Sequence, residues 1–215
     1  VFVGGNFLRA QKTSGGGSAT NQAYLAAFDR DTAELKTGFN PTFNNQIKAL
    51  ATLPGNRIAV GGYFTEVNGS PHNGLVVLNA ATGQVDTAFT GKLINYIGNG
   101  VPVVRTLDVE GDWLYVGGVF THSTGGSNPR EVYTRNAAKF AVGNGTPDSS
   151  WNPEFNGSVI SLDASEQGDR VYFAGFFSQS QGRDADKAAA MSSQNTNLIP
   201  WNVVFSNRAN GRTGY

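Results

Sequence analysis

Hydrophobic positions recur two residues apart in three short runs of the chain. Apolar side chains alternate with polar or small ones over 47–50, 104–109 and 159–162. An alternation of period two predicts half-buried β-strands. Each run is followed by a turn sequence with Gly and Asn or Asp, at 54–56, 110–112 and 167–169. Because Gly and Asn tolerate the positive φ of tight hairpins, each run is predicted to turn back into an antiparallel partner.

The partner strands end in a motif that the chain repeats. Val3-Gly4-Gly5-Asn6-Phe7 has related copies at 60–64, 116–120 and 173–177. The first Gly of each pair, or its Ala substitute, stands at 4, 61, 117 and 174, so the steps are 57, 56 and 57 residues. A near-constant period of this kind is typical of solenoids and propellers. Gly inside a strand marks a close approach, so we expect neighbouring repeats to meet here, with the motif Phe packed alongside.

Each repeat is predicted to hold four short strands, A to D. The runs above are strand A and the motif ends strand B; strand C is expected at 24–28, 75–78, 137–140 and 188–191, and strand D ends at Phe39, Phe89, Trp151 and Trp201. The alanine run before Met191 resembles a helix but aligns with the other C strands, so we predict a strand there. Four antiparallel strands per repeat favour an all-β β-propeller with four-stranded blades. A two-sheet sandwich is the alternative.

The predicted domain is a single β-propeller or a fragment of one, with repeats at approximately 1–43, 44–100, 101–155 and 156–215. The first repeat begins at strand B, and 207–212 lacks the alternation expected of a further strand A. Propellers remove their sheet edges by closing a ring. We therefore expect part of a larger propeller, with further blades from the same polypeptide or another copy. A self-closed ring of four blades is the alternative.

Composition narrows the classes of function. The chain has 16 Lys and Arg against 16 Asp and Glu, a balance that argues against nucleic-acid partners. It has no Cys for thiolate sites and no apolar run of about 18 residues, so no membrane span is expected. Its two His residues would need carboxylates from other loops to bind zinc, and its alternating Asp pairs lack a calcium-loop sequence. We assign no catalytic residue, metal or cofactor.

Three loops are longer than their counterparts in the other repeats. They are the B–C loops at 11–18 and 124–133 and the D–A loop at 92–100. In an up-and-down blade these connections emerge on one face, where a rigid scaffold commonly carries function; drift in unconstrained surface loops is the alternative. Aromatic and Arg residues dominate binding hot spots. The predicted contact residues, all expected to be exposed, are Asn95, Tyr96, Asn128, Arg130, Tyr133 and Arg135.

The second repeat carries a family resemblance. Its segments 60–65, 68–79 and 83–89 resemble the bacterial delta-60 repeat, and are similar to the propeller repeats of a fungal bud-site cortical marker. The resemblance covers nearly the whole chain, closely in the second repeat and loosely in the fourth, and His72 stands where the family usually has Arg. It implies a propeller from secreted or cell-surface bacterial proteins. The motif residues are scaffold residues, so the resemblance implies no catalytic position.

The function expected from these observations is a non-enzymatic, secreted or cell-surface module for binding, adhesion or structure. Its long-loop face would bind a protein or glycan partner. The alternative is a hydrolase or lyase that acts on polysaccharide, with carboxylates close together at a channel mouth.

Overall fold

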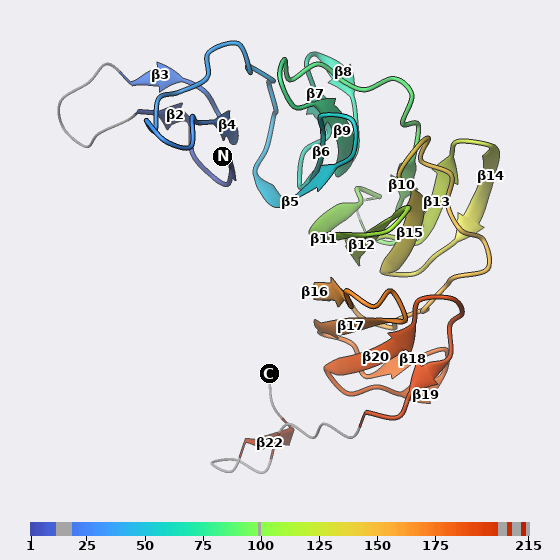
Figure 1. Cartoon of the computed structure of the whole chain (residues 1–215). Coiled ribbons are helices and arrows are strands. Elements are labelled where there is room, and N and C mark those ends of the chain that lie inside the picture. The colour runs from blue at the N-terminus through green and yellow to red at the C-terminus, as the bar shows by residue number, and fades with distance from the viewer. Residues whose placement is uncertain (12–18, 99, 202–205, 208–211, 214–215) are drawn as a thin grey trace.

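The structure, a computed structural model, describes residues 1–11, 19–98, 100–201, 206–207 and 212–213. Within these ranges the regular elements are β-strands, and the paired strands are antiparallel. The fold is therefore all-β, as the alternation predicted. Figure 1 shows four successive units that follow an arc, with the first and the fourth unit at its opposite ends.

Each unit has one main sheet. The main sheets are β1 (Phe2–Gly4) and β4 (Leu25–Ala27) in unit 1; β5 (Ile47–Leu53), β6 (Arg57–Gly62) and β9 (Leu75–Asn79) in unit 2; β11 (Val103–Glu110), β12 (Trp113–Val119) and β15 (Ala137–Ala141) in unit 3; and β16 (Val159–Ala164), β17 (Arg170–Gly175), β20 (Ala188–Ser192) and β21 (Leu198–Ile199) in unit 4. The predicted strands A, B and C are confirmed in units 2 to 4, and the alanine run is strand β20. The predicted turns carry positive φ, +78° at Gly55 and +56° at Gly111.

Strand D is shorter than predicted. In unit 4 strand D is the two-residue strand β21. In the other units it is reduced to single bridges at Leu35, Val85 and Pro147. The aromatic residues expected to end strand D nevertheless become core residues in units 1 to 3. Phe39, Phe89 and Trp151 are buried, whereas Trp201 of unit 4 is 43% exposed.

An outer hairpin joins strands B and C in each unit. The hairpins are β2 (Arg9–Ala10) with β3 (Thr20–Asn21), β7 (Glu66–Val67) with β8 (Ser70–Pro71), β13 (His122–Gly125) with β14 (Asn128–Tyr133), and β18 (Gln179–Ser180) with β19 (Arg183–Asp184). The predicted insertion at 11–18 falls, except for Gln11, outside the described residues. Near the C-terminus, β22 (Ser206–Asn207) pairs with β23 (Arg212–Thr213).

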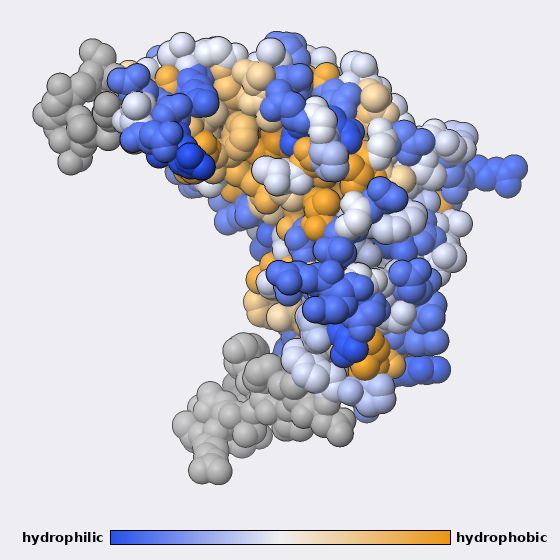
Figure 2. All heavy atoms as spheres, in the orientation of Figure 1, coloured by the Kyte–Doolittle hydropathy of each residue, from blue (hydrophilic) through white to orange (hydrophobic). Residues whose placement is uncertain are grey.

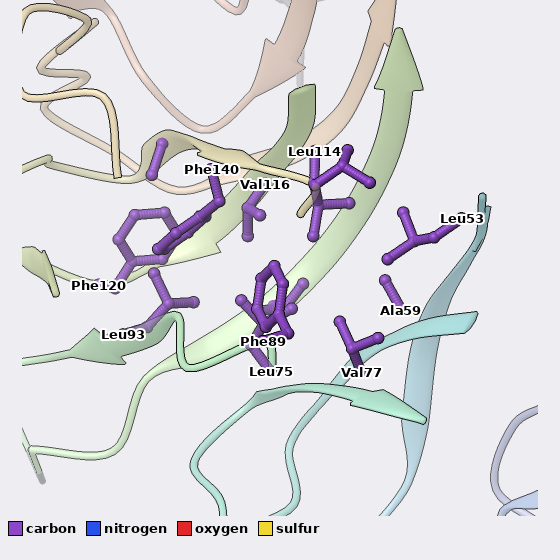
Figure 3. Packing of buried hydrophobic residues seen from close by; sticks show 13 residues of the cluster. Leu53, Ala59, Leu75, Val77, Phe89, Leu93, Leu114, Val116, Phe120 and Phe140 are labelled. Atoms are coloured by element: carbon purple, nitrogen blue, oxygen red, sulfur yellow. The ribbon is translucent and has the colours of Figure 1, made fainter. Parts of the chain in front are cut away.

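The hydrophobic core lies between consecutive units. Successive residues of a strand face opposite sides of its sheet, so each sheet has one apolar face for each neighbour. Leu114 and Val116 of β12 belong to one cluster with Leu53, Ala59 and Val77 of unit 2, which Figure 3 shows, whereas Tyr115 between them clusters with Trp151 and with Phe173 of unit 4. Each of the three core clusters among the described residues therefore combines side chains of two consecutive units.

The repeated Gly residues permit this stacking, as expected. A Cβ added at Gly61 would lie 2.3 Å from Cγ1 of Val104 in the next unit, and one at Gly117 would lie 2.6 Å from Cγ1 of Val159. Neither distance is compatible with a real side chain unless the neighbour moves. The inner strands β5, β11 and β16 consequently contact one another in series along the inside of the arc (Figure 1).

A cation also joins each of the last two pairs of units. The Arg57 Nη1 donates to Val142 O at 3.0 Å and lies 3.3 Å from Asp86 Oδ2. The Lys139 Nζ donates to Ser193 O at 2.8 Å and lies 2.9 Å from Asp148 Oδ2. Arg57 begins strand B and Lys139 belongs to strand C, yet both reach the first carbonyl after strand C of the next unit.

Candidate binding surface

Two of the predicted insertions form a single sheet. Strand β10 (Lys92–Ile94), from the D–A insertion, pairs with β13, and β13 pairs with β14 of the B–C insertion. The register places Leu93 opposite Ser123 and His122 opposite Tyr133. The expectation that these two loops emerge on the same side is confirmed, and Figure 1 shows the three strands together on the outside of the arc.

Three rings form a row on this sheet. The His122 ring lies between Tyr96 and Tyr133, with centroids 5.1 Å and 5.4 Å away, and both contacts are edge-to-face. Tyr96 is 64% exposed and Tyr133 is 42% exposed, whereas His122 is half-buried between them. Edge-to-face ring pairs at these distances are favourable, so the row is held in place while its outer two members face solvent.

Carboxylates hold the two tyrosine hydroxyls. The Tyr96 hydroxyl donates to the Glu131 carboxylate, with oxygen distances of 2.9 Å and 2.8 Å, and the Tyr133 hydroxyl donates to Glu154 Oε1 at 3.4 Å. The hydrogen bond to Glu131, with smaller contributions from burial and from the Glu131 charge, raises the pKa of Tyr96. Tyr96 therefore keeps its proton, and Glu131 joins β14 to the loop after β10.

Below the row, Asn95 shapes the loop that carries Tyr96. Its amide nitrogen donates to the carbonyls of Ile97 at 2.9 Å and Val101 at 3.3 Å, and its oxygen accepts from Ile97 N at 3.2 Å. Tyr96 N donates to Thr121 Oγ1 at 3.1 Å. Asn95 is only 6% exposed, so its predicted exposure is wrong. Its polar groups are used within the loop, which makes Asn95 a positioning residue.

The other predicted residues divide between the sheet and its edge. Arg130 is exposed on β14, and half-buried Asn128 accepts a bond from the Arg130 N at 3.3 Å. Arg135 is half-buried, and its Nη2 donates to Asn156 O at 3.4 Å, close to unit 4. The sequence pattern does not predict His122 as a member of this surface. Its place two residues after the motif Phe120 could have indicated that it enters the outer hairpin.

A small hollow adjoins the other edge of the sheet. It has a volume of about 200 Å³ and is lined by Pro71, His72, Asn73, Leu75, Lys92 and Leu93. Burial and the neighbouring Lys92 charge lower the pKa of His72, so its ring is neutral at pH 7. The hollow is formed by unit 2 and the start of β10, and none of the three rings of the row lines it.

The described residues hold neither a metal-binding cluster nor a membrane-spanning helix. The part of the chain that the structure describes contains no cluster of three or more His, Cys, Asp and Glu residues suited to a metal ion. It contains no helix of the length and hydrophobicity that crossing a membrane requires. Comparison with protein-family models gives no match, and comparison with curated proteins gives no similar sequence.

Proposed function

We propose that the chain is a non-enzymatic binding module of propeller type, whose contact surface is the β10–β13–β14 sheet. The four units act as blades, with strand A innermost in each, and the module is of the delta-60 kind and works in secreted or cell-surface proteins. Support for the blade arrangement comes from the arc in Figure 1 and from the serial contact of β5, β11 and β16. The repeat sequence supports the family and the location.

One observation carries the choice of surface: insertions from two different repeats combine into one sheet that displays the row Tyr96–His122–Tyr133. In units 2 and 4 the outer hairpin has no equivalent of β10 as a third strand among the described residues. A single bridge stands there instead, from Phe43 to Val67 and from Phe155 to Ser180. In unit 3 the inserted residues therefore form an ordered three-stranded sheet. Drift in unconstrained loops predicts no such pairing between insertions.

The chemistry of the surface favours a protein partner. Tyr and Arg are enriched at the centres of protein interfaces, because they combine a large contact area with a polar end. Tyr96, Tyr133 and Arg130 supply these groups, and carboxylates already restrain the two tyrosines. Restraint before binding lowers the entropy lost on association.

The test uses the double variant Tyr96→Ala/Tyr133→Ala on an array of purified extracellular proteins and on a glycan array. We expect a protein signal that falls at least about tenfold in the double variant. Leu8→Ala is the control, because Leu8 is 66% exposed in unit 1 and lies outside the sheet, so this variant should bind normally. Signals on glycans alone would overturn the choice of a protein. Without any signal that depends on the two tyrosines, the proposed surface is wrong.

A polysaccharide-cleaving enzyme is the second candidate, because Asp108 and Asp163 occupy equivalent positions on the neighbouring inner strands β11 and β16. The Asp108 oxygens, however, accept from Val109 N at 2.8 Å and Ala164 N at 2.7 Å, which is a structural use. Release of reducing ends from acidic and neutral polysaccharides, measured with the full chain and with Asp163→Asn, separates the candidates. Activity lost in Asp163→Asn would favour the enzyme.

A further inference from the structure

The outward face of unit 4 repeats the face by which unit 3 binds unit 4. In unit 3 the Tyr115 and Trp151 rings lie 5.5 Å apart at 71°, and in unit 4 the Tyr172 and Trp201 rings lie 5.5 Å apart at 66°. The Trp151 Nε1 donates to Ser192 O of the next unit at 3.0 Å, and Trp151 is fully buried. Trp201 is 43% exposed. The same ring pair is therefore covered in one unit and open in the other.

Two polar side chains of this face are also duplicated. From β11, Thr106 Oγ1 accepts from Leu162 N at 3.2 Å and Asp108 Oδ2 accepts from Ala164 N at 2.7 Å, so both side chains hold the free edge of β16. The equivalent residues on β16 are Ser161 and Asp163. Both residues are exposed, and neither side chain has a hydrogen-bond partner in the described part of the chain, although their backbones pair with β17.

A third correspondence concerns an aromatic ring after the Gly pair. In unit 2 the Tyr63 ring lies 5.6 Å from the guanidinium of Arg105, which belongs to the next unit. Phe176 occupies this position in unit 4 and is 60% exposed, and Ile160 on β16 is 37% exposed. In Figure 2 a hydrophobic area lies at the inner edge of the molecule, near the place of β16 in Figure 1.

One position differs, and it restricts the partner. Gly4, Gly61 and Gly117 give room to Ile47, Val104 and Val159 of the next unit, at distances that exclude a Cβ. Unit 4 has Ala174 at this position, and Ala174 is exposed. Its methyl group occupies the space that a β-branched residue would need. The face therefore suits a strand with Ala, Ser or Gly at that register position.

We propose that this face docks the inner strand of a further unit of the same repeat, which carries a small residue where units 2 to 4 carry Ile47, Val104 and Val159. Backbone N–H groups two residues apart would bind Ser161 and Asp163, and a basic side chain would cover Phe176. The proposal rests on the blade arrangement under the proposed function. A second copy of this chain fits less well, because the described part of unit 1 offers β1 and no inner strand.

The probe is a cyclised, dye-labelled peptide with residues 103–119, the β11–β12 hairpin, made with Val104 and with Val104→Ala. Fluorescence anisotropy measures its affinity for the full chain. The wild-type chain should bind the Ala peptide at least about tenfold more tightly, since overpacking costs that much. Ala174→Gly should bind both peptides to within about threefold. The loss of the preference for the Ala peptide in Ala174→Gly depends only on the size of the side chain at position 174. It is measured on proteins that all remain folded.

Asp163→Ala should weaken binding of the Ala peptide about tenfold, because the acceptor is charged. Asp31→Ala, an exposed carboxylate in unit 1, is the control and should leave the affinity unchanged. Equal affinities for all proteins and peptides would overturn the proposal, while the tyrosine test of the other surface could still succeed. Sedimentation tests the other occupant: a dimer abolished by Asp163→Ala would show that a second copy uses the face.

Discussion

Units 3 and 4 differ in the group that accepts hydrogen bonds from the backbone N–H groups at the start of the outer hairpin. In unit 4 the Asn156 Oδ1 accepts from Ser178 N at 2.9 Å and Gln179 N at 3.0 Å, and Asn44 holds the hairpin of unit 2 in the same way. In unit 3 the equivalent donor, Thr121 N, bonds to Ile94 O at 2.8 Å. A strand has replaced an asparagine side chain. The candidate binding surface is therefore an extension of an ordinary hairpin of this repeat.

The face by which unit 3 packs on unit 4 also differs from the equivalent, outward face of unit 4. Lys139 of β15 is buried at the junction with unit 4, and its Nζ lies 4.3 Å from the centroid of the Trp113 ring of its own unit. Its equivalent on β20 is Ala190. A buried cation is stable only when it is paired and hydrogen-bonded. In unit 3 the next unit supplies part of that pairing through Ser193 O. Stacking thus decides which polar residues a face can carry.

The largest effect is expected from Lys139→Ala, which removes the paired cation from the unit 3–unit 4 junction. The Asp148 carboxylate would stay half-buried without its cation, so unfolding free energy should fall by about 3 kcal/mol in urea titrations. Lys36→Ala, whose exposed amino group lies 3.7 Å from Asp29, is the control and should change stability by less than about 0.5 kcal/mol. Similar losses in both variants would contradict this account.

The same variant has a pH signature. Burial pushes the pKa of Asp148 up, but hydrogen bonds from Ser150 and Lys139 outweigh burial, and its pKa lies below 3.8. A lowered folded-state pKa contributes stability above the unfolded value, and this contribution is lost as the pH falls below it. Acid unfolding below about pH 4 should therefore be shallower in Lys139→Ala than in the wild type.

Next in size is Gly117→Ala, which puts a methyl group 2.6 Å from Val159 Cγ1. We expect a loss of about 2 kcal/mol from overpacking. Ala174→Gly makes the reverse change on the open face of unit 4 and should cost about 0.5–1 kcal/mol, from backbone entropy alone. Thermal and urea unfolding of both variants compare the two faces directly. A Gly117→Ala protein as stable as wild type would show that the glycine is not needed for stacking.

A smaller effect is expected from Asn156→Ala, which leaves the N–H groups of Ser178 and Gln179 without their acceptor. Because both lie at an exposed hairpin where water can replace the bond, the cost should be about 1 kcal/mol. Ile94→Ala in unit 3 keeps the backbone acceptor. Amide hydrogen exchange should therefore accelerate at Ser178 in Asn156→Ala and stay unchanged at Thr121 in Ile94→Ala. Faster exchange at Thr121 would mean that the Ile94 side chain holds the strand.

The smallest effect at neutral pH is expected from Tyr115→Phe, which keeps the ring against Trp151. Burial, with the nearby charges of Glu110, Asp148 and Asp108, raises the pKa of Tyr115 to about 12 from 10.0. A raised folded-state pKa favours the folded state below pH 10 and loses that contribution as the pH rises toward 12. The wild type should therefore lose stability over that range, and Tyr115→Phe should lose less. Parallel alkaline unfolding curves would contradict the shift.

Much of the repeat could be predicted from sequence because its signals are local. Strands A, B and C follow from alternation, and the turns follow from residues such as Gly55 and Gly111 that accept positive φ. The reduced strand D could not be predicted, because Phe39, Phe89 and Trp151 are buried by contacts with other units and need no strand partner of their own. Of the candidate contact residues, Tyr96 and Tyr133 meet on one surface, but burial of Asn95 depends on the course of its loop.

The sequence by itself determined the period, the antiparallel strands and the glycines at the junctions, since each depends on residues close together in the chain or on a repeated residue type. Only the tertiary structure decided that His122 stands between two tyrosines and that β10 joins β13, because these contacts bring together residues from different repeats. The tertiary structure also decided the different burial of Trp151 and Trp201. The two residues end equivalent segments, but Trp151 is fully buried and donates to Ser192 O of unit 4, whereas Trp201 is 43% exposed.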